Sequence, residues 1–552
     1  MNAPAQAPSI EPAKSEARWL TAAVVALLAI AYAISFDLGE PVYLGDENRH
    51  VMTAIYFHDL LSDHPTSGFK THARRFYAQY PALGLMIWPP LFHGICGTLM
   101  LGLGTSFVVA KLLVMAFAAM AATYLFRLVR RTHGAAIAAG TTLLFGLAPL
   151  VFVFSQHVML EMPTVAFSLA TLFHFTRFLD ESRRRDLFLA ALAAAGAALT
   201  RFDAAYLLPL LLGLIAIRKR WNVLARWDTW VAACAAIVLV LPYYALVFKE
   251  AGGLHARQAS QSLMPEDQAA GAWRHLSYYP SQLPMQIGWP MVIAAGIGLL
   301  GFASAERRRQ FVPYACLIGA TYLTFSPLAE LTPRHAIYWI PAFAVLAMQG
   351  IALLFQRANA PAAALGMAAL VAAAGPIQEV SDPSASLHGY AAAARYVVEH
   401  SDSPAVLFDG WLDGNFTYHI RRNDPVRSRF VLRGDKLLYT FLCVPETDYQ
   451  ELARTETQVL ETIAKYDPEY IVVEEPLAMR AIPGSDRLRK VLADHPERFA
   501  LERTVPVTGT AGVFRDYELK IYRVLVRGDA PSRAALVRML TDTGGMTALG
   551  QN

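Results

Sequence analysis

The sequence predicts an α-helical polytopic membrane protein with a soluble α/β domain at its C-terminal end. Of the 552 residues, 55% are hydrophobic and only 17% are charged, whereas soluble domains carry about 25% charged residues. Long apolar runs recur up to about residue 377 and then stop. The sequence that follows alternates helical patterns with short strand-like runs, which is typical of an α/β fold.

The apolar runs predict about eleven transmembrane helices, because roughly 20 apolar residues cross a bilayer. The predicted spans are 18–37, 107–127, 135–153, 159–176, 187–200, 204–217, 228–248, 288–305, 311–328, 335–355 and 361–377. A further apolar stretch, 83–104, contains WPP in its middle. That stretch is expected to lie along the membrane surface as a juxtamembrane helix, with an aromatic residue at headgroup level.

Charge predicts the side on which each loop lies, because short cytoplasmic loops collect lysine and arginine. The basic loops are 127–134, 177–186, 218–227, 305–310 and 355–360. These loops share the side of Lys14 and Arg18 only if 83–104 does not cross the membrane. The long loops 38–106 and 249–287 then face outwards. We therefore expect a multi-pass protein of the bacterial inner (plasma) membrane, with its site and C-terminal domain facing the periplasm or exterior.

The same patterns divide the chain into four parts. The parts are a disordered cytoplasmic N-terminus at 1–17, a transmembrane domain at 18–379, an extracytoplasmic α/β domain at 380–527 and a loosely held tail at 528–552. Within the α/β domain, YAAAARYVVEH has helical periodicity. PAVLFDG, EYIVVEE and ELKIYRVLV read as strands.

Acidic residues lie where two predicted spans meet the outer face. Asp46 and Glu47, in GDENRH, follow the first span, and Glu161, in VMLEMP, falls about one turn inside the fourth. A carboxylate in hydrocarbon costs about 2.5–3.5 kcal/mol on insertion scales, so such residues usually face a wet cavity and serve a function. The alternatives are a helix N-cap for Asp46 and a buried structural glutamate for Glu161.

Cationic residues are expected at the same face. Arg201 and Asp203 lie in LTRFDAA, and Arg334 and His335 lie in PRHAIYWIP. The geometry of a guanidinium group suits the oxygens of a lipid-linked phosphate. The alternative is an arginine that snorkels to phospholipid headgroups.

Two outer loops supply further candidates. In 63–82, cationic and aromatic residues alternate near the membrane, where they can bind a phosphate or a sugar; a solvated loop is the alternative. Loop 249–287 is predicted to be a lid over the outer cavity. The candidates for phosphate binding are Lys70, Arg74 and Arg75, and those for substrate binding are His50, Tyr80, Tyr278, Asp203 and His335. The spacing of the histidines matches no metal-ligand motif, so no metal ligand is predicted, and a divalent metal is kept only as an alternative.

Together these motifs resemble the GT-C glycosyltransferases, and within them the protein O-mannosyltransferase and lipid A aminoarabinose transferase family. The resemblance covers about 30–355 and rests on GDENRH, WPPLFH, VMLEMP, LTRFDAA and PRHAIYWIP in this order. It implies a GT-C-like membrane domain and a donor sugar carried on polyprenyl phosphate. The essential first-loop aspartate of the family corresponds to Asp46, its neighbouring acid to Glu47, and the acid of the second outer loop to Glu161.

Two features depart from that family. The aminoarabinose transferases have a lysine before the PP segment, whereas Trp88 precedes Pro89 here. The β-trefoil insertion of the mannosyltransferases is absent from this sequence. The identity of the donor sugar therefore does not follow from the resemblance.

The resemblance implies an integral-membrane glycosyltransferase that moves a sugar to an acceptor hydroxyl of a protein, lipid or glycan on the outer face. Asp46 is expected to act as the base, and a single displacement inverts the anomeric carbon, unlike the two-step retaining route. Arg334 and Arg201 would stabilise the leaving phosphate. Glu47 and Glu161 would hold hydroxyl groups or pair with an arginine.

Two functions of other classes remain as alternatives. A transporter or flippase of a lipid-linked or envelope glycan often shows repeated halves, and none is found in this sequence. A non-catalytic envelope scaffold would have no need for Glu161 within a span. A net charge of only +4 gives no reason to expect nucleic acid as a partner.

Overall fold

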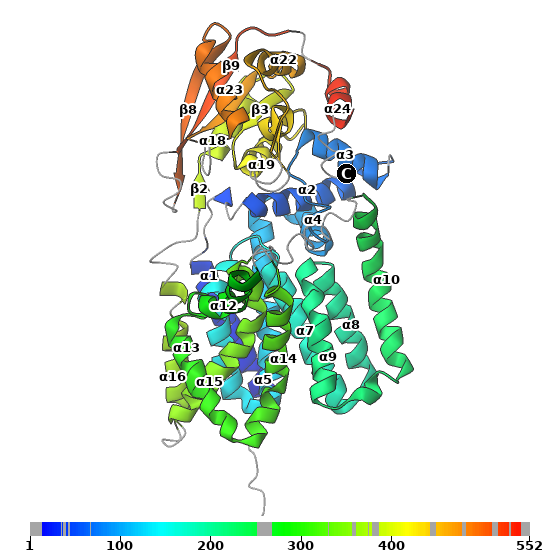
Figure 1. Ribbon diagram of the computed structural model, residues 1–552, viewed down its shortest axis with the longest axis vertical. Coiled ribbons are helices and arrows are strands. Elements are labelled where there is room, and N and C mark those ends of the chain that lie inside the picture. Colours follow the sequence, from blue (N-terminus) through cyan, green and yellow to red (C-terminus); the bar gives the residue numbers. More distant parts are fainter. Residues whose placement is uncertain are drawn as a thin grey trace, which may run out of the picture.

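The computed structural model consists of a helical part and an α/β part that are stacked along the long axis (Figure 1). Helices α2 (Asp46–Asp63), α3 (Phe69–Gln79) and α4 (Leu91–Leu103) lie between the two parts. The structure describes residues 14–34, 36, 40–41, 45–66, 68–250, 268–328, 331–355, 360–373, 375–377, 386–441, 449–476, 482–509, 517–528 and 531–542.

A helix lies at each position where the sequence predicts a membrane span. The helices are α1 (Lys14–Ile34), α5 (Phe107–Gly146), α6 (Pro149–Phe154), α7 (Glu161–Glu181), α8 (Arg184–Ala198), α9 (Leu207–Ile217), α10 (Trp227–Glu250), α13 (Trp289–Leu299), α14 (Ala305–Phe325), α15 (Ile340–Phe355) and α16 (Pro361–Ala372). Short 3-10 helices, η2 (Phe202–Tyr206) and η5 (Pro333–Trp339), precede α9 and α15. The predicted loop 127–134 is helical within α5, which breaks only at Gly134, where φ is 81°.

Several of these helices have the length and composition of membrane spans. Among the described residues, Phe107–Gly146, Trp227–Lys249 and Pro333–Phe355 qualify, and the pair Trp273–Ile287 and Trp289–Ala303, bent by 115°, would make a fourth. On α10, Val238 is 68% exposed and Phe248 70%. A continuous exposed apolar surface of this kind marks contact with lipid or with another protein. The count of about eleven spans stays a prediction.

Two outer segments that the sequence presents as loops contain helices. Helix α3 lies within 63–82, and α12 (Gln268–Ile287) occupies the second half of 249–287. The first half of that predicted lid falls on 251–267, outside the described residues. The predicted surface helix at 83–104 begins only at Leu91, as α4.

The α/β part contains a seven-stranded sheet in the order β1-β2-β8-β9-β7-β3-β4. The strands are β1 (Glu40–Pro41), β2 (Ser386–His388), β3 (Ala405–Asp409), β4 (Phe430–Arg433), β7 (Tyr470–Glu475), β8 (Phe499–Gly509) and β9 (Tyr517–Val524), with β5 (Tyr439–Thr440) and β6 (Gln450–Glu451) forming a separate pair. Strand β3 is parallel to β4 and β7, and the remaining pairs of the large sheet are antiparallel. The helices are α18 (Tyr390–His400), α19 (Asp413–Asn423), α20 (Gly434–Leu437), α22 (Glu456–Tyr466), α23 (Pro483–Asp494) and α24 (Arg533–Asp542).

The sheet and its surroundings extend beyond the domain limits that the sequence predicts. Strand β1 comes from the outer loop after α1 and pairs with β2, so the sheet is not confined to 380–527. In place of a loose tail, Arg533–Asp542 forms α24, which packs on α3 and buries Leu536. The predicted helix at 390–400 and the strands around 405, 470 and 518 are present.

Ionic and polar contacts join the two parts through α2 and α19. Arg421 Nη2 donates to both carboxylate oxygens of buried Asp59, at 2.8 and 2.9 Å. Arg427 Nη2 lies 3.2 Å from the same carboxylate. Nearer the start of α2, Asn48 donates a hydrogen bond to Asn415. The contacts of Arg421 and Asn48 are buried, so the α/β part is held against the helix that begins at Asp46.

On its other side α2 packs closely on α4 at Gly97. A Cβ atom at Gly97 would lie 2.5 Å from the carbonyl oxygen of Ala54 and 2.7 Å from Cβ of Phe57. Apart from its own helix backbone and chain neighbours, no atom of the described residues lies within 4 Å of the corresponding position at Gly94, on the same helix. The absence of a side chain at Gly97 therefore sets the distance between the two helices.

We expect Gly97→Ala to lower the thermal unfolding midpoint of the purified protein, because overpacking a close contact costs about 1–3 kcal/mol. Gly94→Ala is the matched control and should leave the midpoint unchanged or raise it, because alanine favours a helix over glycine by about 1 kcal/mol. Equal midpoints for the two variants would show that the α2–α4 contact does not depend on Gly97.

Candidate functional site

Four segments bring acidic and basic side chains together where the sequence motifs predict a site. Asp46 is the first residue of α2, and Glu161 is the first residue of α7. Arg201 and Asp203 lie at the start of η2, and Arg334 lies in η5. We call Asp46, Glu161, Arg201, Asp203 and Arg334 the carboxylate–arginine cluster.

Arginine side chains connect the carboxylates of this cluster. Arg201 Nη1 donates to Glu161 Oε1 at 2.7 Å, and Arg201 Nε donates to Asp203 Oδ2 at 2.5 Å. Arg334 Nη1 lies 3.4 Å from Asp46 Oδ2 and 3.9 Å from Glu161 Oε1. Glu161 is thus shared between two guanidinium groups, and Arg334 is shared between two carboxylates.

Exposure divides the cluster into a closed and an open end. The side chains of Glu161 and Arg201 are 1% and 9% exposed, whereas those of Arg334 and Asp46 are 15% and 23% exposed. Arg201 is therefore committed to its two carboxylate partners. Asp46 and Arg334 form the end that a substrate can reach.

Asp46 and Glu161 are each the first residue of a helix. The N-terminus of a helix carries a partial positive charge of roughly half an elementary charge, which stabilises nearby carboxylates. The sequence predicts Glu161 about one turn inside the fourth span, whereas the helix α7 begins at Glu161 itself. Asp46 is not the N-cap either, since Gly45, with φ of 73°, precedes it.

Glu47, the second acid of the pair, binds the segment that precedes α7. Its side chain is fully buried, and its Oε1 accepts a hydrogen bond from the Val158 backbone N–H at 2.6 Å. Its Oε2 lies 3.1 Å from His157 Nδ1. Glu47 thereby fixes the turn before α7 against the first turn of α2, which sets the positions of Glu161 and Asp46 relative to each other.

His50 lies one turn after Asp46 on α2 and is completely buried. Its Nδ1 is 3.0 Å from His93 Nε2, and its ring packs on Trp88 with 4.2 Å between centroids. Burial, followed by the charges of His93, Arg201 and Arg334, holds the pKa of His50 well below its usual range. His50 is therefore neutral at pH 7 and contributes shape and hydrogen bonding to the site.

His335 directly follows Arg334 in η5. The side chain is buried, and its ring stacks on Phe325 with 5.5 Å between centroids. Within the described part of the chain, His335 Nδ1 has no hydrogen-bond partner. A buried nitrogen without a partner is costly, which makes this atom a candidate contact for a substrate hydroxyl.

The other predicted site residues lie on different surfaces. Lys70, Arg74 and Arg75 are exposed on α3. Tyr80 is buried beside Arg421, whose guanidinium carbon is 5.9 Å from the ring centroid. Tyr278 is half-buried on α12, where it packs against its neighbour Tyr279. In the described ranges, the side chains of Arg74, Arg75, Tyr80 and Tyr278 show no contact with the carboxylate–arginine cluster.

The structure adds three residues to the site that the sequence motifs alone did not predict. Tyr338 donates its hydroxyl hydrogen to Asp203 at 3.2 Å and stacks on Tyr206. His157 and His93 contact Glu47 and His50, as described above. Tyr338 follows Arg334 by four residues in PRHAIYWIP, about one helical turn, and this spacing could have predicted Tyr338 as a member of the site.

Among the described residues, no group of three or more His, Cys, Asp or Glu side chains could hold a metal ion.

Residues 89–245 match the family model described as dolichyl-phosphate-mannose-protein mannosyltransferase. The matched range is somewhat over a quarter of the chain. No curated protein sequence matches significantly. ArnT from Cupriavidus metallidurans, in a crystal structure bound to undecaprenyl phosphate, is similar in structure, with a TM-score of 0.58 and 14% identity over 93% of this chain and 99% of ArnT.

Two other solved structures are similar over most of this chain. The oligosaccharyltransferase of Archaeoglobus fulgidus, tethered to an acceptor peptide, gives a TM-score of 0.53 and 11% identity over 82% of this chain and 69% of its own. The arabinofuranosyltransferase AftD from Mycobacteria gives 0.52 and 15% identity over 94% of this chain and 40% of its own. The chain thus has the fold of the GT-C glycosyltransferases, and the resemblance to them that its motifs predict is confirmed.

Proposed function

We propose that this protein is an integral-membrane glycosyltransferase that moves a sugar from a polyprenyl-phosphate donor to an acceptor hydroxyl. The observation that carries the proposal is the pairing of Asp46 with Arg334 at the open end of the carboxylate–arginine cluster. The fold and the family match over 89–245 support the reaction class. Undecaprenyl phosphate bound to the similar ArnT structure supports a polyprenyl-phosphate donor.

Asp46 is the residue that can take the proton of the acceptor. A hydroxyl group has a pKa far above 7, so it needs a base in the transition state, and a positioned base typically contributes 10²–10⁴-fold. In the described part of the chain, the one ion pair of Asp46 is the 3.4 Å contact to Arg334. Glu161 and Asp203 are engaged more closely by Arg201, so they are less available.

Arg334 is the residue that can bind the phosphate of the donor. As the sugar leaves, negative charge accumulates on this phosphate, and a positioned cation stabilises it in a site of low dielectric. Arg334 is more exposed than Arg201, and its distances to carboxylates are longer. We therefore assign phosphate binding to Arg334 and a positioning role to Arg201.

The reaction is then a single displacement. A bond forms between the acceptor oxygen and the anomeric carbon, the bond between this carbon and the phosphate oxygen breaks, and the acceptor proton passes to Asp46. A displacement in one step inverts the anomeric carbon. We place this reaction at the outer face of the inner membrane, because the predicted basic loops lie at the opposite ends of the helices.

We expect Asp46→Asn to reduce sugar transfer by a factor of about 10²–10⁴, because the amide cannot accept the proton. Cells that lack the gene would be complemented with each variant, and their envelope glycans and glycolipids would be compared by mass spectrometry. Asp63→Asn is the matched control, since Asp63 is exposed at the other end of the same helix. Full transfer by Asp46→Asn, with both variants equally abundant in membranes, would rule out Asp46 as the base.

We expect Arg334→Ala to weaken the binding of undecaprenyl phosphate to the purified protein by at least about tenfold, through loss of the charge-assisted contact. Arg334→Lys should retain part of the affinity, because lysine keeps the charge but not the planar fork. Arg454→Ala, at an exposed arginine of the α/β part, serves as the control. Unchanged binding by Arg334→Ala together with weaker binding by Arg74→Ala would move the phosphate site to α3.

A further inference from the structure

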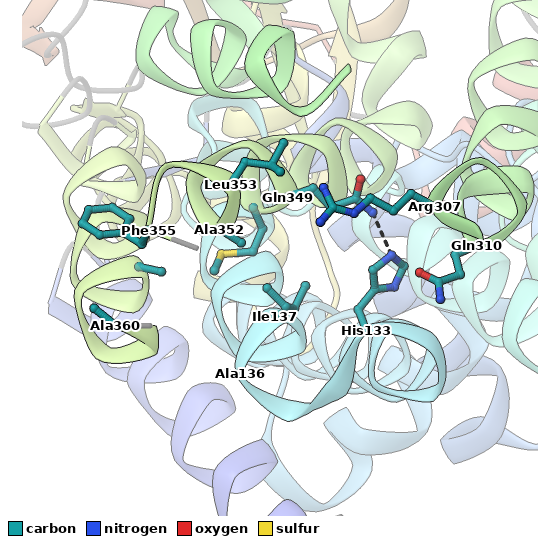
Figure 2. A pocket seen from close by; sticks show the side chains of 12 residues that line it. His133, Ala136, Ile137, Arg307, Gln310, Gln349, Ala352, Leu353, Phe355 and Ala360 are labelled. Atoms are coloured by element: carbon teal, nitrogen blue, oxygen red, sulfur yellow. Dashed lines mark hydrogen bonds between the residues drawn. The ribbon is translucent and has the colours of Figure 1, made fainter. Parts of the chain in front are cut away.

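The helical part contains a cavity of about 400 Å³ far from the carboxylate–arginine cluster. Helices α5, α14, α15 and α16 supply its walls (Figure 2). Gln349, on α15, is separated from Arg334 by about 20 Å along the axis at 1.5 Å per residue. The cavity therefore lies near the helix ends that carry the basic loops, and it is separate from the proposed reaction centre.

One end of the cavity presents an unused hydrogen-bond acceptor. Gln349 is only 6% exposed, and its Nε2 lies 2.7 Å from His133 Nε2. His133 Nδ1 is 2.6 Å from Thr132 Oγ1. If His133 Nδ1 carries the hydrogen, its Nε2 accepts from the Gln349 amide. Gln349 is part of the cavity wall, and its Oε1 is then buried with no partner in the described part of the chain, a deficit that costs about 1–3 kcal/mol.

Arg307 also lines the cavity and supplies a positive charge, and Figure 2 shows it on the same side as His133 and Gln310. Two arginines at these helix ends have a carboxylate partner, since Arg131 and Arg218 lie 3.1 and 2.7 Å from Asp180. Arg307, in contrast, has no carboxylate within 4.0 Å in the part of the chain that the structure describes. The neighbouring Glu306 is exposed and accepts a hydrogen bond from Gln310 instead, at 2.9 Å.

The other end of the cavity is apolar. Phe355 on α15 and Ala360 before α16 line it, and Figure 2 shows both on the side opposite to Arg307 and Gln310. The volume is within the range of about 300–1,000 Å³ that is usual for ligand sites. A ligand that matches both ends has an anionic group, a hydrogen-bond donor near it, and a hydrocarbon segment.

We propose that this cavity binds a membrane phospholipid with an anionic, hydroxyl-bearing headgroup. Arg307 binds the phosphate, for which a guanidinium group is well suited. Gln349 Oε1 accepts a hydrogen bond from a headgroup hydroxyl, and the apolar end receives the beginning of an acyl chain. A fatty-acid carboxylate fits less well, because it carries no donor for Gln349. This site is independent of the proposed glycosyltransferase reaction.

The test is a native mass spectrometry titration of the full-length protein in detergent micelles with phosphatidylglycerol, phosphatidylcholine, oleate or inorganic phosphate. We expect phosphatidylglycerol to bind at least about tenfold more tightly than phosphatidylcholine, which is zwitterionic and has no donor. Arg307→Ala and Gln349→Leu should each weaken phosphatidylglycerol binding by at least about fivefold. Arg309→Ala, an exposed arginine on the same helix, is the matched control and should leave binding unchanged.

The outcomes separate this proposal from its alternatives. If Arg307→Ala and Arg309→Ala weaken phosphatidylglycerol binding equally, the lipid is attracted to a basic surface and the proposed site is overturned. Equal affinity for phosphatidylcholine, or tighter binding of oleate, also overturns the proposed site. Displacement of the lipid by equimolar inorganic phosphate overturns the role of the apolar end. Arg307→Ala should still bind undecaprenyl phosphate normally, so failure of this proposal and failure of the proposed function give different results. Thermal unfolding of each variant confirms that it is folded.

Discussion

The burial of Glu161 is the constraint on which the site depends. A carboxylate that is 1% exposed at the head of a helix is stable only with a matched positive charge. Arg201 and Arg334 provide this charge from segments far apart in the sequence. Removing one partner of such a buried pair typically costs 3–5 kcal/mol. The ion pairs with Glu161 therefore hold η2 and η5 against the start of α7. Asp203 belongs to η2 and Tyr338 to η5, so both residues are placed at the site as well.

The same arrangement produces a region that favours anions. Helices α2 and α7 both begin at the cluster, so their N-terminal N–H groups add partial positive charge to that of the two arginines. An anion that replaces the weak contact between Asp46 and Arg334 loses little, because the two groups are 3.4 Å apart and partly exposed. A phosphate leaving group fits this region better than a neutral one, which accords with a lipid-phosphate donor.

The sequence predicts the members of the cluster better than their surroundings. Asp46, Glu161, Arg201, Asp203 and Arg334 were placed together because charged residues at the ends of apolar runs must share a wet boundary. Helices α3 and α12 were missed, since both are rich in polar residues and lie in segments without a long apolar run. Strand β1 has only two residues, too few for any periodicity, and its pairing with β2 depends on a partner about 345 residues away.

The α/β part has a structural reason to be present, because it supports helix α2. Helix α2 carries Asp46, and it is held on one face by α4 and on the other by α19. Asp413 lies 3.6 Å from Arg49, less than one turn after Asp46, and Arg421 binds Asp59 near the other end. Both ends of α2 are thereby fixed by charges of the α/β part. Positioning of the proposed general base to within about 0.5 Å requires rigid support of this kind. The α/β part therefore acts on the site through the placement of Asp46.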